Sequence, residues 1–440
     1  MNYEEANAYL ESTIDERASP RVPARLERMR SLLRELGDPQ HAYPAIHVGG
    51  TSGKGSTSTM IAAALTATGK RVGLHTKPHV TSVTERMRID GNPIAPEAFA
   101  GLLGESMPAI ERVAREETRP TYYETLLGLS LLYFARERVD VAVVEVGLGG
   151  RLDGTNVLEP IASAITNIGL DHVDVLGDTV EAIARDKVGI AKFGIPLVSD
   201  VADGPARVEI EAGCARAGAP FIAVRERSRV EPRGGTHAGQ SFDVVTANAR
   251  YALALPVLGG FQRRNAATAV VVLENLPEYL RPTPHDVERG LASVAIAGRM
   301  EYFPAHPSIV FDIAHNADKA ANLASALREE FPAQRFAFVV AIGESKDATA
   351  IVEPLAELPA SFVFTTFEVA GRPSTRPQRL ASIVAQRGVA ARAIADPLEA
   401  FAIARRTAGA DDIVVVTGST FIVATLRAWW LANVVAAHRR

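Results

Sequence analysis

Short apolar runs alternate with longer segments of helical periodicity along most of the chain. The run at 141–146 is almost continuously apolar, which is typical of a strand buried on both faces of a parallel sheet. Similar short runs predict strands at 46–48, 72–75 and 161–167. Between them, apolar residues recur at helical spacing and predict the following helices: 3–12, 22–36, 54–68, 96–116, 121–134 and 178–192. Regular alternation of this kind predicts an α/β protein with mostly parallel sheets.

The pattern weakens between residues 197 and 258 and restarts near residue 298. The weak region predicts several short strands and a turn at Gly234–Gly235. A long helix follows from about residue 260, and strands and helices alternate again from residue 309 onward. We therefore expect two domains, residues 1–297 and a smaller, Rossmann-like α/β domain at residues 298–440.

Composition narrows the class of protein. The 440 residues are 47% hydrophobic and 22% charged, with a net charge of −4, which gives no sign of a nucleic-acid-binding surface. The single cysteine, Cys214, excludes an intrachain disulfide and suits a reducing compartment. The first residues lack the pattern of a signal peptide, and no apolar run reaches membrane-spanning length. We expect a cytoplasmic protein with no membrane or nucleic-acid partner.

The segment Gly49–Thr57 joins a predicted strand to a predicted helix through glycines, a lysine and hydroxyl residues. Glycines let backbone N–H groups close around an anion, and the start of a helix adds partial positive charge. A lysine such as Lys54 reaches the outer phosphates, and a hydroxyl can bind Mg²⁺. The order of residues differs from the common P-loop motif, because Val48 stands where a first glycine is common and Gly55 separates Lys54 from Ser56. The segment still predicts a P-loop-type domain that binds a nucleoside triphosphate; the alternative is an ordinary glycine turn.

Two further polar residues follow strands at the same predicted sheet edge. Glu145 lies near the end of the strand at 141–146, and His172 lies in a loop just after the strand at 161–167. Ligands bind at the carboxyl edge of open α/β sheets, so a metal or phosphate role is predicted for both. The alternatives are a structural carboxylate and a hydrogen-bonded structural histidine. Lys187, by spacing alone, reads as a solvated lysine.

Together these motifs resemble the folylpolyglutamate synthase/dihydrofolate synthase family of the Mur ligase superfamily. The resemblance covers nearly the whole chain. The segments that carry it are Gly50–Ser56, Pro78–His79 with Glu85–Arg86, Glu145–Asp153, Thr155–Val157, Asp171–His172, Lys187–Ile190, Gln262 with Asn265–Ala266, Gly298–Arg299 with Glu301, Asp312 with Ala314–Asn316, and Thr417–Ser419.

The resemblance implies an ATP-dependent ligase that joins a pteroate or folate carboxylate to the amino group of L-glutamate. A carboxylate is a poor electrophile, so transfer of the ATP γ-phosphoryl group first gives an acyl phosphate with a good leaving group. Such transfer depends mainly on positioning and on neutralising charge. Mg²⁺, small-molecule substrates and a monomeric state are implied, and domain closure around a shared ATP would complete the site.

The same resemblance assigns roles to individual residues. ATP binding is implied for Gly50, Thr51, Ser52, Gly53, Lys54, Gly55, Ser56, Asn265, Arg299 and Asp312. Magnesium binding is implied for Ser56, Glu145 and His172, and substrate binding for His79, Asp153 and Asn156. Catalytic roles are implied for Lys54, Lys187 and His315; Lys187 matches a lysine that is carbamylated in this superfamily.

Some positions depart from the family pattern. Lys77 stands where the family usually has a serine that can serve the magnesium site. A charged lysine cannot bind a metal, so Lys77 either contacts a phosphate or repels the metal. Phe261, Ala297, Ile313 and Ala317 are further departures. They leave open a related amide ligase with a non-folate acceptor, or a nucleotide-binding relative without ligase activity.

Overall fold

The computed structural model describes residues 1–14, 24–369 and 371–435, which form two compact units. The first unit comprises Met1–Arg233, Ser241–Ala254 and Phe261–Val294, and the second comprises Gly234–Gln240, Leu255–Gly260 and Ala295–Arg440. Residues 22–23 of the predicted second helix lie outside the described part. None of the helices in the described ranges combines the length and apolar character that a bilayer-spanning segment needs.

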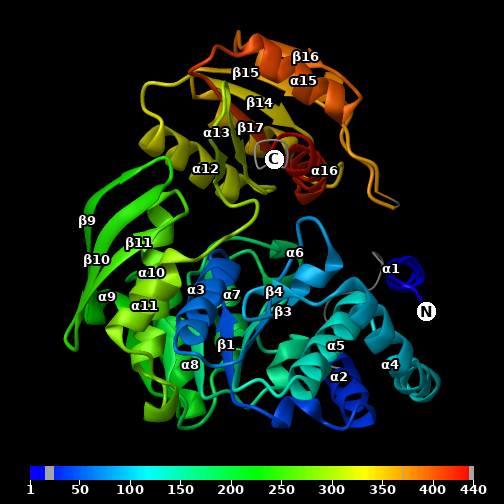
Figure 1. The fold of residues 1–440 in the computed structure, drawn as a ribbon, viewed down its shortest axis with the longest axis vertical. Helices are drawn as coiled ribbons and strands as arrows, with labels where there is room; N and C mark the ends of the chain where they lie inside the picture. Colours follow the sequence, from blue (N-terminus) through cyan, green and yellow to red (C-terminus); the bar gives the residue numbers. More distant parts are fainter. Residues whose placement is uncertain (15–23, 370, 436–440) are drawn as a thin grey trace. The chain divides into compact units, whose positions relative to one another are not determined.

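An eight-stranded sheet forms the centre of the first unit (Figure 1), in the order β4-β3-β2-β5-β1-β6-β7-β8. Its strands are β1 Ala45–Gly49, β2 Val72–His75, β3 Met87–Ile89, β4 Asn92–Pro93, β5 Val141–Glu145, β6 Ala162–Ile165, β7 Leu197–Ser199 and β8 Phe221–Ala223. The six strands from β2 to β8 run parallel, whereas β3 and β4 pair antiparallel at one edge. Every residue of β1 and β5 is buried, as their apolar sequences predict.

Helices cover this sheet. They are α1 Tyr3–Ser12, α2 Ala24–Glu35, α3 Lys54–Ala67, α4 Pro96–Glu116, α5 Tyr122–Arg136, α6 Val173–Leu176, α7 Val180–Lys187, α8 Pro205–Ala217, α9 Val224–Arg227, α10 Gly260–Glu274 and α11 Pro284–Ala292. Local sequence explains where several begin: Asn2 with Glu5, and Thr121 with Glu124, form capping boxes. Helix α3 lies beside α11 (Figure 1), where Gly290 allows the two backbones to approach closely.

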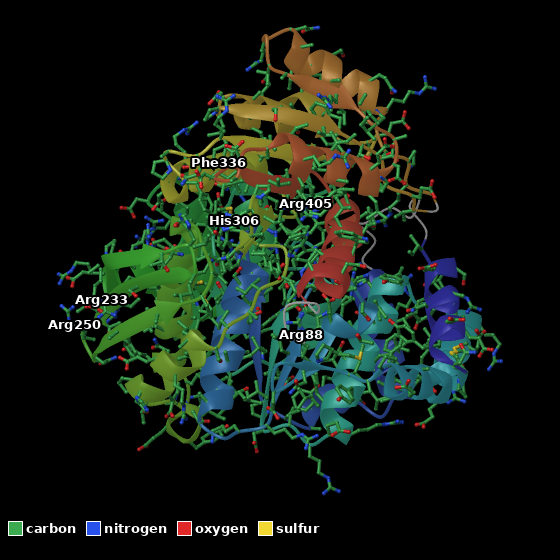
Figure 2. All side chains as sticks on the ribbon, turned by 45° about the horizontal axis from the view of Figure 1, so that its top comes forward. Arg88, Arg233, Arg250, His306, Phe336 and Arg405 are labelled. Carbon is green, nitrogen blue, oxygen red and sulfur yellow. The ribbon has the colours of Figure 1, made fainter. Side chains whose placement is uncertain are left out.

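Three strands form a separate sheet in the order β11-β10-β9: β9 Ser228–Thr236, β10 Gly239–Thr246 and β11 Arg250–Leu255. Asp243 on the middle strand pairs with Arg233 and with Arg250 on the outer strands, and the two arginines lie near each other in Figure 2. The predicted turn at Gly234–Gly235 is wrong. Both glycines lie within β9, and the turn comes at residues 237–238. Two adjacent glycines indicate a turn only when no neighbouring strand supplies hydrogen bonds.

The second unit has a six-stranded sheet in the order β12-β13-β17-β14-β15-β16. Its strands are β12 Glu301–Phe303, β13 Ser308–Phe311, β14 Phe336–Val340, β15 Ala360–Phe364, β16 Ala391–Ala393 and β17 Ile413–Thr417. Only β12 pairs antiparallel. Its helices are α12 Ala317–Glu330, α13 Ala348–Ala356, α14 Pro377–Ala385, α15 Pro397–Thr407 and α16 Thr420–Trp430. Stacked rings of Phe338, Phe362 and Phe364 contribute to its core.

The predicted fold class, two mostly parallel α/β sheets, is confirmed. The chain pattern missed α8 and the short strands β3 and β12. The helix predicted at 178–192 ends at Lys187, and a 3₁₀ turn follows at Val188–Ile190. Strands β3 and β12 are both only three residues long and carry too little apolar sequence to stand out from loops.

Candidate functional site

The glycine loop joins β1 to α3 in a conformation that only glycine tolerates. Gly50 has φ +133° and Gly53 has φ +80°, both in the region that side chains disfavour. A Cβ on Gly50 would overlap the Thr166 hydroxyl, and a Cβ on Gly53 would overlap Asn265 Oδ1. Glycine therefore stands at both strained positions before α3. The backbone N–H groups that begin α3 favour an anion at this end of the helix.

The loop after β6 holds the glycine loop in place. The N–H of Thr51 donates to the Asn167 carbonyl (2.9 Å), and the N–H of Ser52 donates to Asn167 Oδ1 (2.7 Å). The Thr166 hydroxyl donates to the Ser52 carbonyl at 2.6 Å. Since β1 and β6 are neighbours in the sheet, these polar residues brace the phosphate loop from the side. The sequence predicts Thr166 and Asn167 only as the end of a strand. Their position at the carboxyl edge of the sheet is the feature that could have indicated a supporting role at the glycine loop.

Two lysines converge on one carbonyl of the glycine loop. Lys54 Nζ donates to the carbonyls of Gly50 and Thr51, each at 3.0 Å. Lys187 Nζ, 137 residues away in sequence, also donates to the Gly50 carbonyl at 3.0 Å. The structure thus places the Lys187 side chain against the glycine loop. Spacing alone predicts a solvated lysine, because the spacing of residues within α7 does not show which segment its last turn faces.

Burial and charge both act on Lys187. Burial, together with the positive charge of Lys77, lowers the pKa of the Lys187 ammonium to about 8, although the carboxylates of Asp171 and Asp186 oppose this. A larger share of neutral amine is therefore present at neutral pH than in an exposed lysine. A neutral amine is the form that reacts with CO₂.

Glu145 ends β5 with a buried side chain beside the start of α3. Its Oε2 accepts the backbone N–H of Lys77 at 2.9 Å, and it lies 3.1 Å from where a Cβ of Gly55 would be. Ser56, next along α3, is also buried, and no hydrogen bond of its hydroxyl is found within the described residues. A carboxylate and a hydroxyl are hard oxygen donors, so this pair fits Mg²⁺.

His172 lies in the loop that follows β6. It has φ +52°, its side chain is 42% exposed, and its Nε2 is 3.9 Å from Asp171 Oδ1. The loop is tied to the glycine loop, since Thr51 Oγ1 donates to the Gly169 carbonyl and accepts the Gly169 N–H. No group of three or more histidine, cysteine, aspartate or glutamate side chains is arranged to hold a metal in the described ranges.

The side chains of Asp153 and Asn156 form hydrogen bonds with other residues of the protein. Asp153 accepts the N–H groups of Gly147, Leu148 and Thr155 at 2.8 to 3.2 Å, and also the Thr155 hydroxyl. Asn156 Nδ2 donates to the carbonyls of Arg151 and Gly189. These bonds shape the glycine-rich segment after β5.

His79 lies in the loop after β2, where Arg86 Nε donates to its Nδ1 at 3.0 Å. Burial and the positive charge of Arg86 lower the pKa of His79 to about 4. The imidazole is therefore neutral at pH 7, with its proton on Nε2.

Asn265 lies behind the glycine loop. Its Nδ2 donates to Gln262 Oε1 at 2.9 Å, and its Oδ1 occupies the space that a side chain at Gly53 would need. Within the described residues, Gln262 Nε2 is buried and finds no acceptor. The pair therefore supports the turn at Gly53 from one face of α10.

In the second unit, Asp312 shapes the backbone around Arg299. Its two carboxylate oxygens accept the N–H groups of Met300 (2.9 Å) and Ala314 (2.8 Å). Burial raises the pKa of Asp312, while the charge of Arg299 and these two hydrogen bonds act in the opposite direction. Arg299 and Asp312, which sequence reasoning selected together, thus lie close to each other.

His315 follows β13. Its Nδ1–H donates to the Ile313 carbonyl at 2.8 Å, and its Nε2 lies 3.4 Å from Lys319 Nζ. Burial and the charge of Lys319 lower the pKa of His315 to about 3. The imidazole is neutral and offers a lone pair at Nε2.

The two α/β units define a class of protein: their fold is that of a Mur ligase. The chain matches the model of the Mur ligase middle domain over residues 48–273 and that of the Mur ligase glutamate ligase domain over residues 298–420. It is 31% identical to the dihydrofolate synthase/folylpolyglutamate synthase of Bacillus subtilis over 91% of this chain and 94% of that protein.

The chain belongs to the folylpolyglutamate synthase/dihydrofolate synthase family and is an ATP-dependent amide ligase of that family. A solved structure of Mycobacterium tuberculosis folylpolyglutamate synthase complexed with ADP superimposes with a TM-score of 0.88 at 28% identity, covering 97% of this chain and 98% of that one. The chain spans about half (49%) of a probable bifunctional folylpolyglutamate synthase/dihydropteroate synthase of Haloferax volcanii, at 35% identity over 94% of this chain.

Proposed function

We propose that this chain adds L-glutamate to the carboxylate of dihydropteroate, of reduced folates, or of both. The observation that carries the proposal is the convergence of Lys54 and Lys187 on the Gly50 carbonyl, beside the buried Glu145. Lys54 supplies positive charge at this loop, where phosphoryl transfer needs it. The double name of the Bacillus subtilis relative supports both acceptors.

In the proposed reaction, an acceptor carboxylate oxygen attacks the γ-phosphorus of ATP, and ADP leaves. The glutamate amine then attacks the acyl carbon, and inorganic phosphate leaves with one former carboxylate oxygen. Lys54 and the N–H groups that begin α3 would hold the transferring phosphoryl group and its developing charge. Mg²⁺ bound by Ser56, Glu145 and His172 would supply further charge neutralisation at the phosphates.

We propose that Lys187 is carbamylated in the active enzyme. Its neutral amine would add to the carbon of CO₂ and release one proton, which converts a cation into a carboxylate directed at the metal. The carbamate nitrogen keeps one N–H, so the bond to the Gly50 carbonyl can persist. The roles proposed for the second unit are nucleotide contact for Arg299 and Asp312 and a catalytic role for His315.

The test is a panel of acceptors in which ADP release and the mass of the glutamylated product are measured together. We expect ADP release to need both L-glutamate and a pteroate or folate. With ¹⁸O in the acceptor carboxylate, one labelled oxygen should appear in phosphate per turnover. ADP release without any response to a pterin would refute the acceptor, and unlabelled phosphate would refute the acyl phosphate.

A further inference from the structure

Asp200 is a buried carboxylate at the carboxyl edge of the first unit's sheet, and the reaction outlined above gives it no role. It follows β7, and its two oxygens accept hydrogen bonds from the Arg264 guanidinium, one of them at 3.1 Å from Nε. A second guanidinium, that of Arg225, lies 3.5 Å from Asp200 Oδ1 and donates to the Asp200 carbonyl at 3.0 Å. Bidentate bonds between a guanidinium and a carboxylate fix the direction of the arginine side chain and are stronger than bonds between neutral groups.

The ion pair ties the sheet to the N-terminal part of α10. Arg264 directly precedes Asn265, whose Oδ1 lies where a side chain on Gly53 would need space. Because the two residues are consecutive on one helix, the bond to Asp200 fixes the place of this helical turn relative to the strands. Asn265 is thereby held against the glycine loop at Gly53, which has φ +80°.

The main chain of Asp200 reaches the glycine loop by a second route. Its N–H donates to the Ile165 carbonyl at 3.2 Å, and Thr166, the next residue, donates its hydroxyl to the Ser52 carbonyl at 2.6 Å. Asp200 therefore connects the support that follows β6 with the support that Asn265 provides from α10. A residue that joins both supports keeps the distance between them constant.

The exposure of the two arginines separates this role from a purely structural one. The side chain of Asp200 is 8% exposed, whereas those of Arg264 and Arg225 are 30% and 47% exposed. If Asp200 loses its charge, water can hydrate both guanidinium groups, so no buried charge is left unpaired. We therefore expect the neutral variant to fold, with its main change at the N-terminal part of α10.

We propose that Asp200 is a positioning residue for the nucleotide: through Arg264 it holds Asn265 against Gly53, and so it maintains the shape of the glycine loop. The inference rests on the proposed binding of ATP at this loop and does not depend on the identity of the acceptor.

The test is the affinity for ADP, measured by calorimetry at fixed Mg²⁺ with the full chain and no acceptor. Asp200→Asn should bind ADP about five- to tenfold more weakly than wild type, since a neutral amide replaces a charged bidentate acceptor. Glu274→Gln is the matched control, because Glu274 accepts hydrogen bonds at the other end of α10, from the hydroxyls of Thr246 (2.6 Å) and Tyr251 (2.8 Å). It should bind ADP like wild type.

A double-mutant cycle with Asn265 separates positioning from a general loss of stability, and far-UV circular dichroism checks that each variant folds. If Asp200 acts through Asn265, adding Asp200→Asn to Asn265→Ala should weaken ADP binding by less than about twofold. Wild-type affinity in Asp200→Asn, or the full five- to tenfold further loss in the double variant, would overturn the proposal.

Gly53→Ala reports separately on the nucleotide site. ADP affinity that this variant leaves unchanged would overturn the proposed binding of nucleotide at the glycine loop, and the role of Asp200 with it. Because ADP binding involves no acceptor, a failure of the proposed pteroate or folate acceptor would leave all these affinities as expected.

Discussion

Replacing Asp153 by asparagine tests whether this residue anchors a loop or binds substrate. The carboxylate is buried and accepts hydrogen bonds from three main-chain N–H groups, from the Thr155 hydroxyl and from Tyr123. Four of these bonds reach Oδ1, and the N–H of Leu148 reaches Oδ2 at 2.8 Å. Both carboxylate oxygens therefore accept hydrogen bonds from the protein's own donors.

An amide at position 153 keeps one oxygen and puts an NH₂ group where the other oxygen was. The best arrangement keeps Oδ1 and turns the amide nitrogen toward the Leu148 N–H. A hydrogen bond to a charged group contributes about 1.5–3 kcal/mol, and a buried donor left unpaired costs about 1–3 kcal/mol. We therefore expect Asp153→Asn to lower the free energy of unfolding of the first unit by about 3–5 kcal/mol.

The assay combines urea unfolding with hydrogen–deuterium exchange of residues 147–157. Both tryptophans, Trp429 and Trp430, lie in the second unit, so tryptophan fluorescence reports that unit. We expect the far-UV circular dichroism transition and the loop exchange to shift, while the tryptophan transition stays in place. Thr155→Ser, which keeps the hydroxyl donor, is the control. Unchanged stability with a raised KM for the pteroate or folate alone would refute the anchoring role and make Asp153 a substrate ligand.

Three further predictions concern the site and its support. Gly53→Ala should weaken ATP binding at least about tenfold by calorimetry, because the new Cβ meets Asn265 and φ is +80°; equal affinity would contradict the role of this turn. Burial and the charge of Arg86 lower the pKa of His75 from 6.5 to about 3, so its stabilising effect is complete above pH 6.5 and is lost as pH falls toward 3. Between pH 7.5 and 5, urea unfolding should lose about 2 kcal/mol less in His75→Gln than in wild type, and equal losses would argue against a neutral buried imidazole. Lys187→Ala should abolish a ¹³C carbamate signal formed with ¹³CO₂ and cut turnover at least about 100-fold; a signal that persists would place the carbamate elsewhere.

Much of the candidate site could be predicted because its residues follow strands. Glu145 ends β5, and Lys54, Lys77 and His172 follow β1, β2 and β6; these four strands are adjacent in the sheet. Polar residues at the carboxyl ends of adjacent parallel strands gather at one edge. The apolar runs that predict the strands therefore also predict where the polar residues at their carboxyl ends lie.

Other features could not be predicted because they depend on contacts between distant segments. Lys187 meets the Gly50 carbonyl only because α7 ends beside the glycine loop. Asp153, selected as a substrate ligand, has its carboxylate occupied by N–H groups of its own loop. Residue type and spacing do not show which segment the end of a helix faces, and they do not show which groups hydrogen-bond to a buried carboxylate.

By itself, the sequence determined the alternation of strands and helices, the glycine loop and the family, because these depend on local periodicity and on short contiguous motifs. The tertiary structure alone decided that Lys54 and Lys187 share a carbonyl, that Asn265 requires glycine at position 53, and that Lys77 is held against Glu145. These outcomes follow from packing between segments more than 60 residues apart (Lys77 to Glu145 is 68). Such packing sets burial and charge proximity, which in turn set the chemistry of each amine and carboxylate.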